Sequence, residues 1–156
     1  MPDRCAQRVR QLRMDLLPPD GIPWRTVREA IADLPDPRQP GAWRAAHNHN
    51  YVPGARSYKG HTGSPLDEPA KTLKAGDHGV PGGENTLVYP DGSIRYLTVR
   101  ESARLQSFPD GFVFHGSWTE SMRQLGNAVP VVLGEAVAAR IASALRQAAS
   151  KGTKSR

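Results

Sequence analysis

The last part of the chain carries an apolar stripe that the preceding sequence has little means to cover. Pro130 suits the first turn of a helix, and the apolar residues that follow it recur at the spacing of one helical face. They are Leu133, Ala136, Val137, Ile141, Ala144 and Leu145. A helix of about 15 residues gains most of its stability by packing such a face. The chain is therefore either a small mixed domain with a helical end or a part that docks through this stripe onto another polypeptide.

The middle of the sequence limits what can pack there. The chain has 15 glycines and 14 prolines among 156 residues, so much of it must be loop. Residues 38–92 are especially rich in Gly, Pro, His and Asn, with short candidate strands only at 70–73 and 86–89. An Asp-Gly turn signal then leads into a third candidate strand at 93–97. We expect an α+β chain whose middle is either disordered or an irregular binding surface.

Three capping signatures mark the starts of further helices. In each, a Ser or Thr precedes a Glu by three residues, so the hydroxyl accepts a helix N–H and the carboxylate accepts the N–H of the cap. The pairs are Thr26 and Glu29, Thr98 and Glu101, and Ser117 and Glu120. The first predicts a short helix through Leu34, and the second predicts a helix that Phe108-Pro109-Asp110-Gly111 terminates. The third predicts a helix through Leu125 that Gly126 closes in a left-handed conformation.

The net charge of +6 and the pI of 9.9 point toward anionic partners such as nucleic acid, but the distribution weakens that inference. No acid follows Glu135, and the cations beyond it are most simply a solvated C-terminal end. Residues 41–97 carry six cations against five acids. Net charge alone therefore does not make that stretch a DNA surface.

Several classes of site and location are not expected. Cys5 is the single cysteine, which excludes an intrachain disulfide framework and a cysteine-built zinc site. His47, His49, His61 and His78 lack a carboxylate or thiol at the spacing that completes a metal site. No apolar run approaches the roughly 20 residues of a membrane span, and the first residues lead into no signal segment. We therefore expect no metal, no membrane and a cytoplasmic location.

Two long blocks stand near the end of the sequence, RYLTVRESARLQSFPD at residues 95–110 and QLGNAVPVVLGEAVA at residues 124–138. They resemble the ninth and tenth motifs of the DNA cytosine C5-methyltransferase family. Their order and spacing also agree. TVREAIADLP at 26–35 is similar to a segment that often follows the eighth motif, and PAKTLKAG at 69–76 resembles the target-recognition region. The resemblance covers roughly residues 24–145.

The resemblance implies a reaction whose central groups this sequence does not carry. The family adds a cysteine thiolate to carbon 6 of a flipped-out cytosine, and the resulting enamine takes the methyl group of S-adenosylmethionine. In family members the nucleophile lies in a Pro-Cys motif, and a Glu-Asn-Val motif steadies the ring nitrogen of the cytosine. A glycine-rich turn holds the cofactor. Cys5 lacks the preceding proline, and Glu84-Asn85-Thr86 stands just before the ninth motif, which is the wrong order for catalysis. We predict that the chain alone is inactive.

The fold that the resemblance implies is the C-terminal fragment of a two-domain methyltransferase. It would comprise an irregular, β-rich recognition domain and the helical segments that return to a missing α/β cofactor-binding domain. The expected divisions are an N-terminal segment with a possible helix at 1–23, a target-recognition region at 24–97, a helical segment at 98–149 and a basic, disordered tail at 150–156. The expected partners are double-stranded DNA and an N-terminal catalytic chain. The alternatives are a noncatalytic DNA-binding or interaction module and a truncated remnant.

The same resemblance assigns candidate site residues, none of them catalytic. The expected contacts to S-adenosylmethionine, once the missing half is present, are Asn127, Ala128 and Val129. The expected DNA contacts, which can pair with phosphates or base edges, are Arg56, Tyr58, Lys59, His61, Lys71, Lys74 and His78. The residues expected to organise the junction between domains are Arg95, Arg100, Glu101, Arg104 and Gln106. Helix capping and surface salt bridges explain several of the last group equally well.

Overall fold

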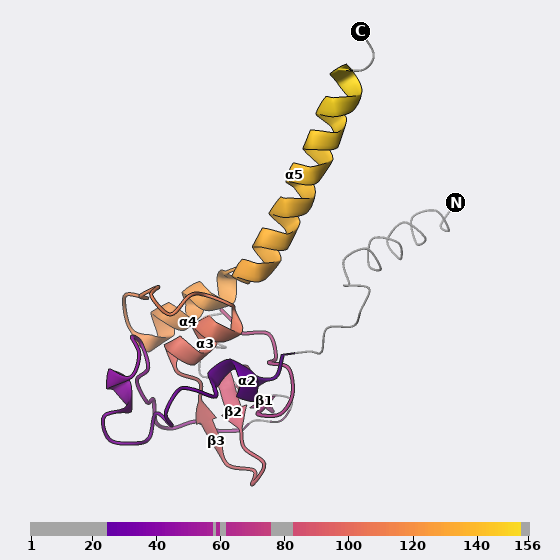
Figure 1. Ribbon diagram of the computed structural model, residues 1–156. Coiled ribbons are helices and arrows are strands. Elements are labelled where there is room, and N and C mark those ends of the chain that lie inside the picture. The colour runs from indigo at the N-terminus through magenta and orange to yellow at the C-terminus, as the bar shows by residue number, and fades with distance from the viewer. Residues whose placement is uncertain (1–24, 58, 60–61, 76–82, 154–156) are drawn as a thin grey trace.

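The computed structural model describes residues 25–57, 59, 62–75 and 83–153 and arranges them as a small body from which one long helix projects (Figure 1). In chain order the elements are α2 (Val27–Ile31), the 3-10 turn η1 (Ala42–Arg44), β1 (Ser64–Pro65), the 3-10 turn η2 (Gly83–Asn85), β2 (Thr86–Val88), β3 (Ile94–Tyr96), α3 (Val99–Leu105), α4 (Trp118–Asn127) and α5 (Val131–Thr153). The body is α+β, as expected.

A three-stranded sheet in the order β1-β2-β3 forms the centre of the body. Strand β1 runs parallel to β2, with Ser64 opposite Leu87, and β3 runs antiparallel to β2, with Arg95 opposite Leu87. The strands predicted at 86–89 and 93–97 are thus confirmed. The strand predicted at 70–73 is wrong, because this segment is extended but its backbone is held by side chains: the Lys71 N–H donates to the Ser64 hydroxyl at 3.0 Å.

Two of the three capping signatures form as predicted, at Thr26 and at Thr98. At the third, the Ser117 hydroxyl accepts from the Glu120 N–H at 3.2 Å, but the Glu120 carboxylate pairs with Arg123. Helix α2 ends at Ile31, before the predicted Leu34, whose N–H instead closes a turn onto the Ile31 carbonyl at 3.0 Å.

The predicted role of Gly126 is also wrong. Helix α4 continues through Gly126 to Asn127, and Gly126 is absent from the glycines with positive φ. Its small size serves a different purpose. A Cβ atom at this position would lie 2.7 Å from the backbone N of Ala75 and 2.7 Å from the carbonyl carbon of Lys74. Gly126 is therefore required for close backbone approach.

One hydrophobic core joins the sheet to α2, α3 and α4. Its fully buried members include Val27 of α2, Leu87 of β2, Leu97 directly after β3, and Met122 and Leu125 of α4. The indole of Trp118 packs on the edge of this core, and its Nε1–H donates to the Leu97 carbonyl at 3.1 Å. Because residues before and after the start of α3 share this core, the described residues between 25 and 97 form one packed unit with helices α3 and α4.

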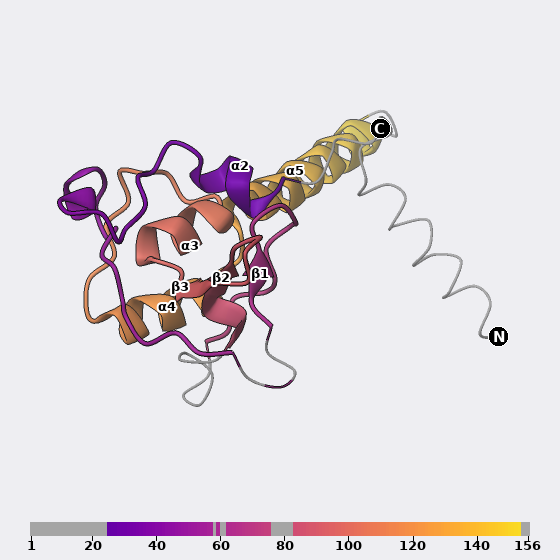
Figure 2. The ribbon, with the colours of Figure 1, turned by 90° about the horizontal axis from the view of Figure 1, so that it is seen from below.

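Helix α5 contributes nothing to that core. In Figure 1 and Figure 2 it extends away from the body as a straight rod, and its 23 residues make it longer than the helix expected from the stripe. Val131 is half-buried at its start, and the large apolar side chains that follow are 44% to 65% exposed. They are Val132, Leu133, Val137, Ile141 and Leu145. The helical stretch Trp118–Ala149 contains a window of 18 residues with mean hydropathy 1.6, so by length and composition alone it passes for a membrane span. Glu135 and Arg140 interrupt the apolar sequence of α5.

Candidate functional site

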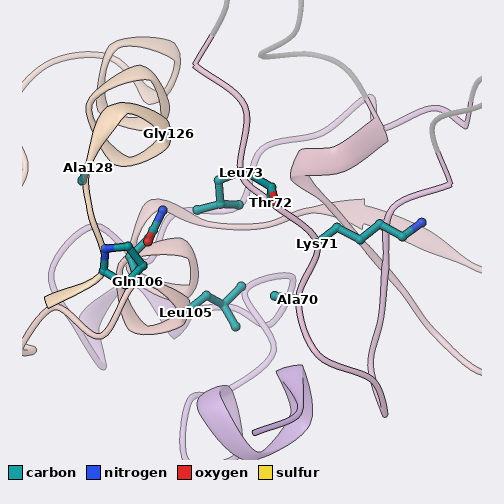
Figure 3. Close-up of a pocket in the computed structure, with 9 residues that line it drawn as sticks. Ala70, Lys71, Thr72, Leu73, Leu105, Gln106, Gly126 and Ala128 are labelled. Carbon is teal, nitrogen blue, oxygen red and sulfur yellow. The ribbon is translucent and has the colours of Figure 1, made fainter. Parts of the chain in front are cut away.

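A cavity of about 280 Å³ lies where three segments distant in sequence meet (Figure 3). The recognition-like segment contributes residues 70–73, the end of α3 contributes Leu105 and Gln106, and the α4–α5 connection contributes Gly126, Ala128 and Pro130. The structure thus brings residues of the ninth-motif and tenth-motif blocks together with the segment that resembles the target-recognition region.

Gln106 and Ser107 hold the α4–α5 connection from both sides. The Gln106 side chain donates from Nε2 to the Leu125 carbonyl at 3.0 Å. The backbone carbonyl of Gln106 accepts from the Val131 N–H at 3.1 Å. Ser107, held at a φ of 57°, accepts from the Val132 N–H at 3.5 Å through its hydroxyl. The turn between the two helices is therefore attached at each end to the C-terminus of α3.

The predicted cofactor contacts lie in this turn. Asn127 is the last residue of α4 and is exposed, Ala128 is half-buried beside the cavity, and Val129 is 63% exposed. Of the three, only Ala128 is among the residues that line the cavity.

Asn85 and Gly126 fix the end of the recognition-like segment. The Asn85 carboxamide accepts from the Lys74 N–H at 3.3 Å and donates to the Lys74 carbonyl at 3.4 Å. On the opposite side, Gly126 of α4 lies directly against the Lys74–Ala75 peptide. Asn85 is fully buried in this role.

Four of the seven residues predicted to contact DNA lie in the part of the chain that the structure describes. Arg56 and Lys59 are exposed. The Lys71 ammonium donates to the Thr62 hydroxyl, and the Lys74 ammonium lies 3.6 Å from the Glu84 carboxylate. Tyr58, His61 and His78 lie outside the described residues, as does Cys5.

Among the predicted junction residues, Arg95 and Glu101 form a buried ion pair that joins β3 to α3. The Arg95 guanidinium donates to both carboxylate oxygens of Glu101, at 2.7 and 2.6 Å, and Glu101 also accepts from the Thr98 N–H at 2.8 Å. Burial lowers the pKa of Arg95, but hydrogen bonds to Glu101 and Tyr89 outweigh that effect and leave the pKa above its ordinary value. The pair fixes the start of α3 on the sheet.

Arg100 holds two loops together from inside the body. Its side chain is fully buried and donates to three backbone carbonyls: that of His47 at 2.8 Å, that of Pro109 at 3.2 Å and that of Phe112 at 2.6 Å. Burial lowers the pKa of this guanidinium.

Arg104 links three segments at the surface of the body. It pairs with Asp33 after α2 and with Asp110 after α3, the latter at 2.6 Å. These hydrogen bonds raise the pKa of Arg104, and the hydrogen bonds from Arg104 lower the pKa of each of its two carboxylate partners. Arg104 therefore ties the ends of α2 and α3 to the turn that follows.

Sequence analysis missed the structural importance of Asn48 and His49. Asn48, with a φ of 64°, donates to and accepts from the backbone of Phe114 at 2.9 Å. His49 is fully buried between the Thr98 hydroxyl, 3.0 Å from Nδ1, and the Pro35 carbonyl, 2.8 Å from Nε2. Because a carbonyl only accepts, Nε2 carries the proton. No three metal-ligating side chains come together within residues 25–57, 59, 62–75 and 83–153.

The chain is similar in sequence to known proteins of one family. The sequence pattern of the family described as C-5 cytosine-specific DNA methylase matches residues 24–143. The Type II methyltransferase M.AplI of Arthrospira platensis is 44% identical over 89 residues, which cover 56% of this chain and 26% of that protein. The Type II methyltransferase M.MthTI of Methanothermobacter thermautotrophicus is 34% identical over 140 residues, which cover 74% of this chain and 42% of that protein.

The match extends beyond prokaryotes but remains partial. The DNA (cytosine-5)-methyltransferase CMT2 of rice, Oryza sativa subsp. japonica, is 48% identical over 58 residues, which cover 37% of this chain and 4% of that protein. The chain thus spans less than half the length of each of these relatives. Because the family pattern covers most of the chain, the resemblance seen in the two motif blocks is confirmed, and the chain belongs to the C-5 cytosine-specific DNA methylase family.

Proposed function

We propose that this chain is the target-recognition part of a DNA cytosine C5-methyltransferase and that its α4–α5 turn completes the S-adenosylmethionine pocket of a catalytic part lying outside these 156 residues. The observation that carries the proposal is the unpartnered apolar face of α5, which follows the turn directly. A helix this apolar gains from burial against a second surface. Docking there would bring the turn and the recognition segment to the same catalytic part.

The division of chemical roles follows from which groups the chain has. S-adenosylmethionine supplies the methyl group, and a thiolate must activate the cytosine. The single cysteine, Cys5, lacks the proline of the family's nucleophile motif, so the thiolate would come from the catalytic part. This chain contributes the Asn127 carboxamide, with Ala128 and Val129, as one edge of the cofactor pocket.

The recognition role falls to the segments around 54–62 and 69–82. Arg56, Lys59, Lys71 and Lys74, with Tyr58, His61 and His78, are the proposed contacts to phosphates and base edges. The four cations provide the charge, and the Asn85 and Gly126 contacts described above give the 69–75 segment a fixed backbone. Buried polar contacts from Arg95, Glu101 and Arg100, together with Arg104, would keep this surface aligned with the junction.

The test is complementation in cells that lack cytosine methylation. The chain is coexpressed with a second chain that carries the glycine-rich turn, Pro-Cys and Glu-Asn-Val motifs of the family, and plasmid DNA is mapped for 5-methylcytosine. We expect methylation only when both chains are present, and we expect it to persist with Cys5→Ser. Replacing the Pro-Cys cysteine of the second chain by serine is the matched control and should abolish methylation.

The same assay separates the alternatives. Grafting residues 41–93 from a relative of different specificity should change the methylated sequence and leave the reaction intact. Methylation by the chain alone, or loss of methylation with Cys5→Ser, would show that the nucleophile has been assigned wrongly. DNA binding by the chain with no methylation in the presence of the second chain would instead identify a noncatalytic binding module.

A further inference from the structure

Helix α5 leaves the body without packing on it, so its direction must be set where it starts. The three residues between α4 and α5, ending at Pro130, are the only covalent link. The noncovalent links in this region come from the C-terminal end of α3, through Gln106 and Ser107. We propose that Gln106 is a positioning residue that fixes the α4–α5 turn, and with it the cofactor edge formed by Asn127 and its neighbours. The identity of that ligand rests on the proposed function.

Gln106 is suited to this role because it reaches both ends of the turn. It caps α3, and its N–H donates to the Ser102 carbonyl at 3.1 Å, so its backbone is fixed to the core. The side chain of Gln106 donates to the Leu125 carbonyl in the last part of α4. The backbone carbonyl of Gln106 accepts from the first N–H of α5, that of Val131. One residue therefore sets the distance between the end of one helix and the start of the next.

The end of α4 is packed in the core, so the hydrogen bond from Gln106 joins α3 to a backbone that the core already holds in place. The Leu125 side chain is fully buried in the core, and its carbonyl accepts both the Gln106 amide and the Ala128 N–H, the latter at 3.2 Å. Gly126 is held against the Lys74–Ala75 peptide. Beyond Ala128, the printed contacts between the start of α5 and α3 are those of the Val131 N–H to the Gln106 backbone carbonyl and of the Val132 N–H to the Ser107 hydroxyl.

The contact requires a hydrogen-bond donor at position 106. The Leu125 carbonyl lies at the C-terminal end of α4, where the helix dipole is negative. A glutamate at position 106 cannot donate when ionised and would place a second negative group there. A methionine has similar length and apolar volume but no donor, so Gln106→Met removes the hydrogen bond with little change in packing.

The experiment uses the two-chain enzyme of the complementation assay and the chain by itself. We expect Gln106→Met to raise the KM for S-adenosylmethionine about tenfold, the size of effect expected from losing one hydrogen bond to a partly buried carbonyl. The KM for DNA and the methylated sequence should not change. The matched control is Gln39→Met, the same replacement at an exposed residue whose described contacts are made by its backbone.

Amide exchange on the isolated chain gives a readout that does not depend on activity. In Gln106→Met, the amides of Ala128 and Val131 should exchange faster, while the Leu97 amide, which donates to the Asn85 carbonyl in the core, should keep its protection. Equal increases in both KM values, or faster exchange throughout the core, would reveal a merely structural role and overturn the proposal. Unchanged exchange at Ala128 and Val131 would also overturn it. Failure of the wild-type pair to methylate DNA would refute the proposed function and leave the exchange test of Gln106 decisive.

Discussion

Helices α4 and α5 are consecutive and both carry apolar residues at helical spacing, yet the apolar face of α4 is buried and that of α5 is exposed. Helix α4 buries Ser121, Met122 and Leu125 against the sheet and α3. In helix α5 every large apolar side chain after the half-buried Val131 is at least 44% exposed. The difference does not lie in the periodicity of either sequence. It lies in what the rest of the chain provides to cover each face.

This contrast shows that an amphipathic pattern predicts a helix and a buried face but not the surface that buries it. For α4 that surface is the core of the body, so its packing contributes to the stability of this chain. For α5 the proposed surface belongs to the catalytic part. Substitutions in α4 should therefore change the stability of the isolated chain, and substitutions in α5 should change the activity of the two-chain enzyme.

The largest expected effect comes from a charge on the exposed stripe. Ile141→Asp should lower complementation activity by about 100-fold or more, because burying an isoleucine side chain contributes about 1.5–3 kcal/mol and a buried unpaired carboxylate adds a further penalty. The melting temperature of the isolated chain should not change, since Ile141 is 56% exposed there. Activity is measured by methyl transfer to plasmid DNA, and the melting temperature by circular dichroism.

The control for this prediction is Ala139→Asp, which places the same charge on the opposite face of α5. It should leave both activity and melting temperature close to the wild-type values. If the two aspartates impair activity equally, the stripe is not the docking face.

The next largest effect should come from the body. Glu101→Gln leaves the buried Arg95 guanidinium without its carboxylate, and breaking one side of a buried pair costs about 3–5 kcal/mol. The side chains of the pair are 4% and 1% exposed, so water cannot replace the lost charge. The free energy of unfolding is measured by urea titration. Glu120→Gln, which breaks the exposed pair with Arg123, is the control and should cost far less, because solvent screens that pair. Equal losses would show that burial does not matter here.

The parts of the fold that could be predicted from sequence depend on short-range signals. The Thr26 and Thr98 caps join residues three positions apart, and β2 and β3 follow from a turn and a local β-rich pattern. The parts that could not be predicted depend on distant contacts. His49 bonds to Thr98, 49 positions away, and Gly126 touches Ala75. No local pattern specifies either partner.

The candidate site divides in the same way. The motif resemblance singled out Gln106 and the Asn127–Val129 turn from sequence, because those blocks are long and continuous. It did not reveal that Gln106 bonds to Leu125, 19 positions away, or that the Asn85 side chain pairs with the Lys74 backbone. Those contacts exist only once the sheet and α3 have brought the segments together.

A smaller effect is expected when a glycine is replaced by alanine in each of the two helices. Gly126→Ala should destabilise the body by about 1–3 kcal/mol, because the new methyl group overlaps the Lys74–Ala75 backbone and forces a shift. Gly134→Ala in α5 meets nothing within 4 Å and should stabilise that helix by about 0.5–1 kcal/mol through the better helix propensity of alanine. Urea titration reports the first change and helix content by circular dichroism reports the second. Effects of the same sign would contradict the packing difference between α4 and α5.

The smallest expected effect is a dependence on pH confined to the body. Hydrogen bonds from Arg38 lower the pKa of Asp36 to about 2 from its usual 3.8. Because the folded state depresses this pKa, the stabilisation is complete above pH 3.8 and is lost as the pH falls toward 2. With the Asp36 side chain 27% exposed, we expect a loss of about 1–2 kcal/mol across that window.

Asp36→Asn should flatten this part of the profile, which is measured as the free energy of unfolding between pH 5 and pH 2. Asp67→Asn is the control: Asp67 pairs with Arg28, and the hydrogen bond lowers its pKa too, but its side chain is 60% exposed and solvent screens the pair. Its removal should change the profile less. Over the same pH range the helix content of α5 should persist, because its only acid is Glu135 and no buried ion pair of the body depends on it. Acid unfolding of α5 together with the body would show that the two regions are coupled more tightly than their packing indicates.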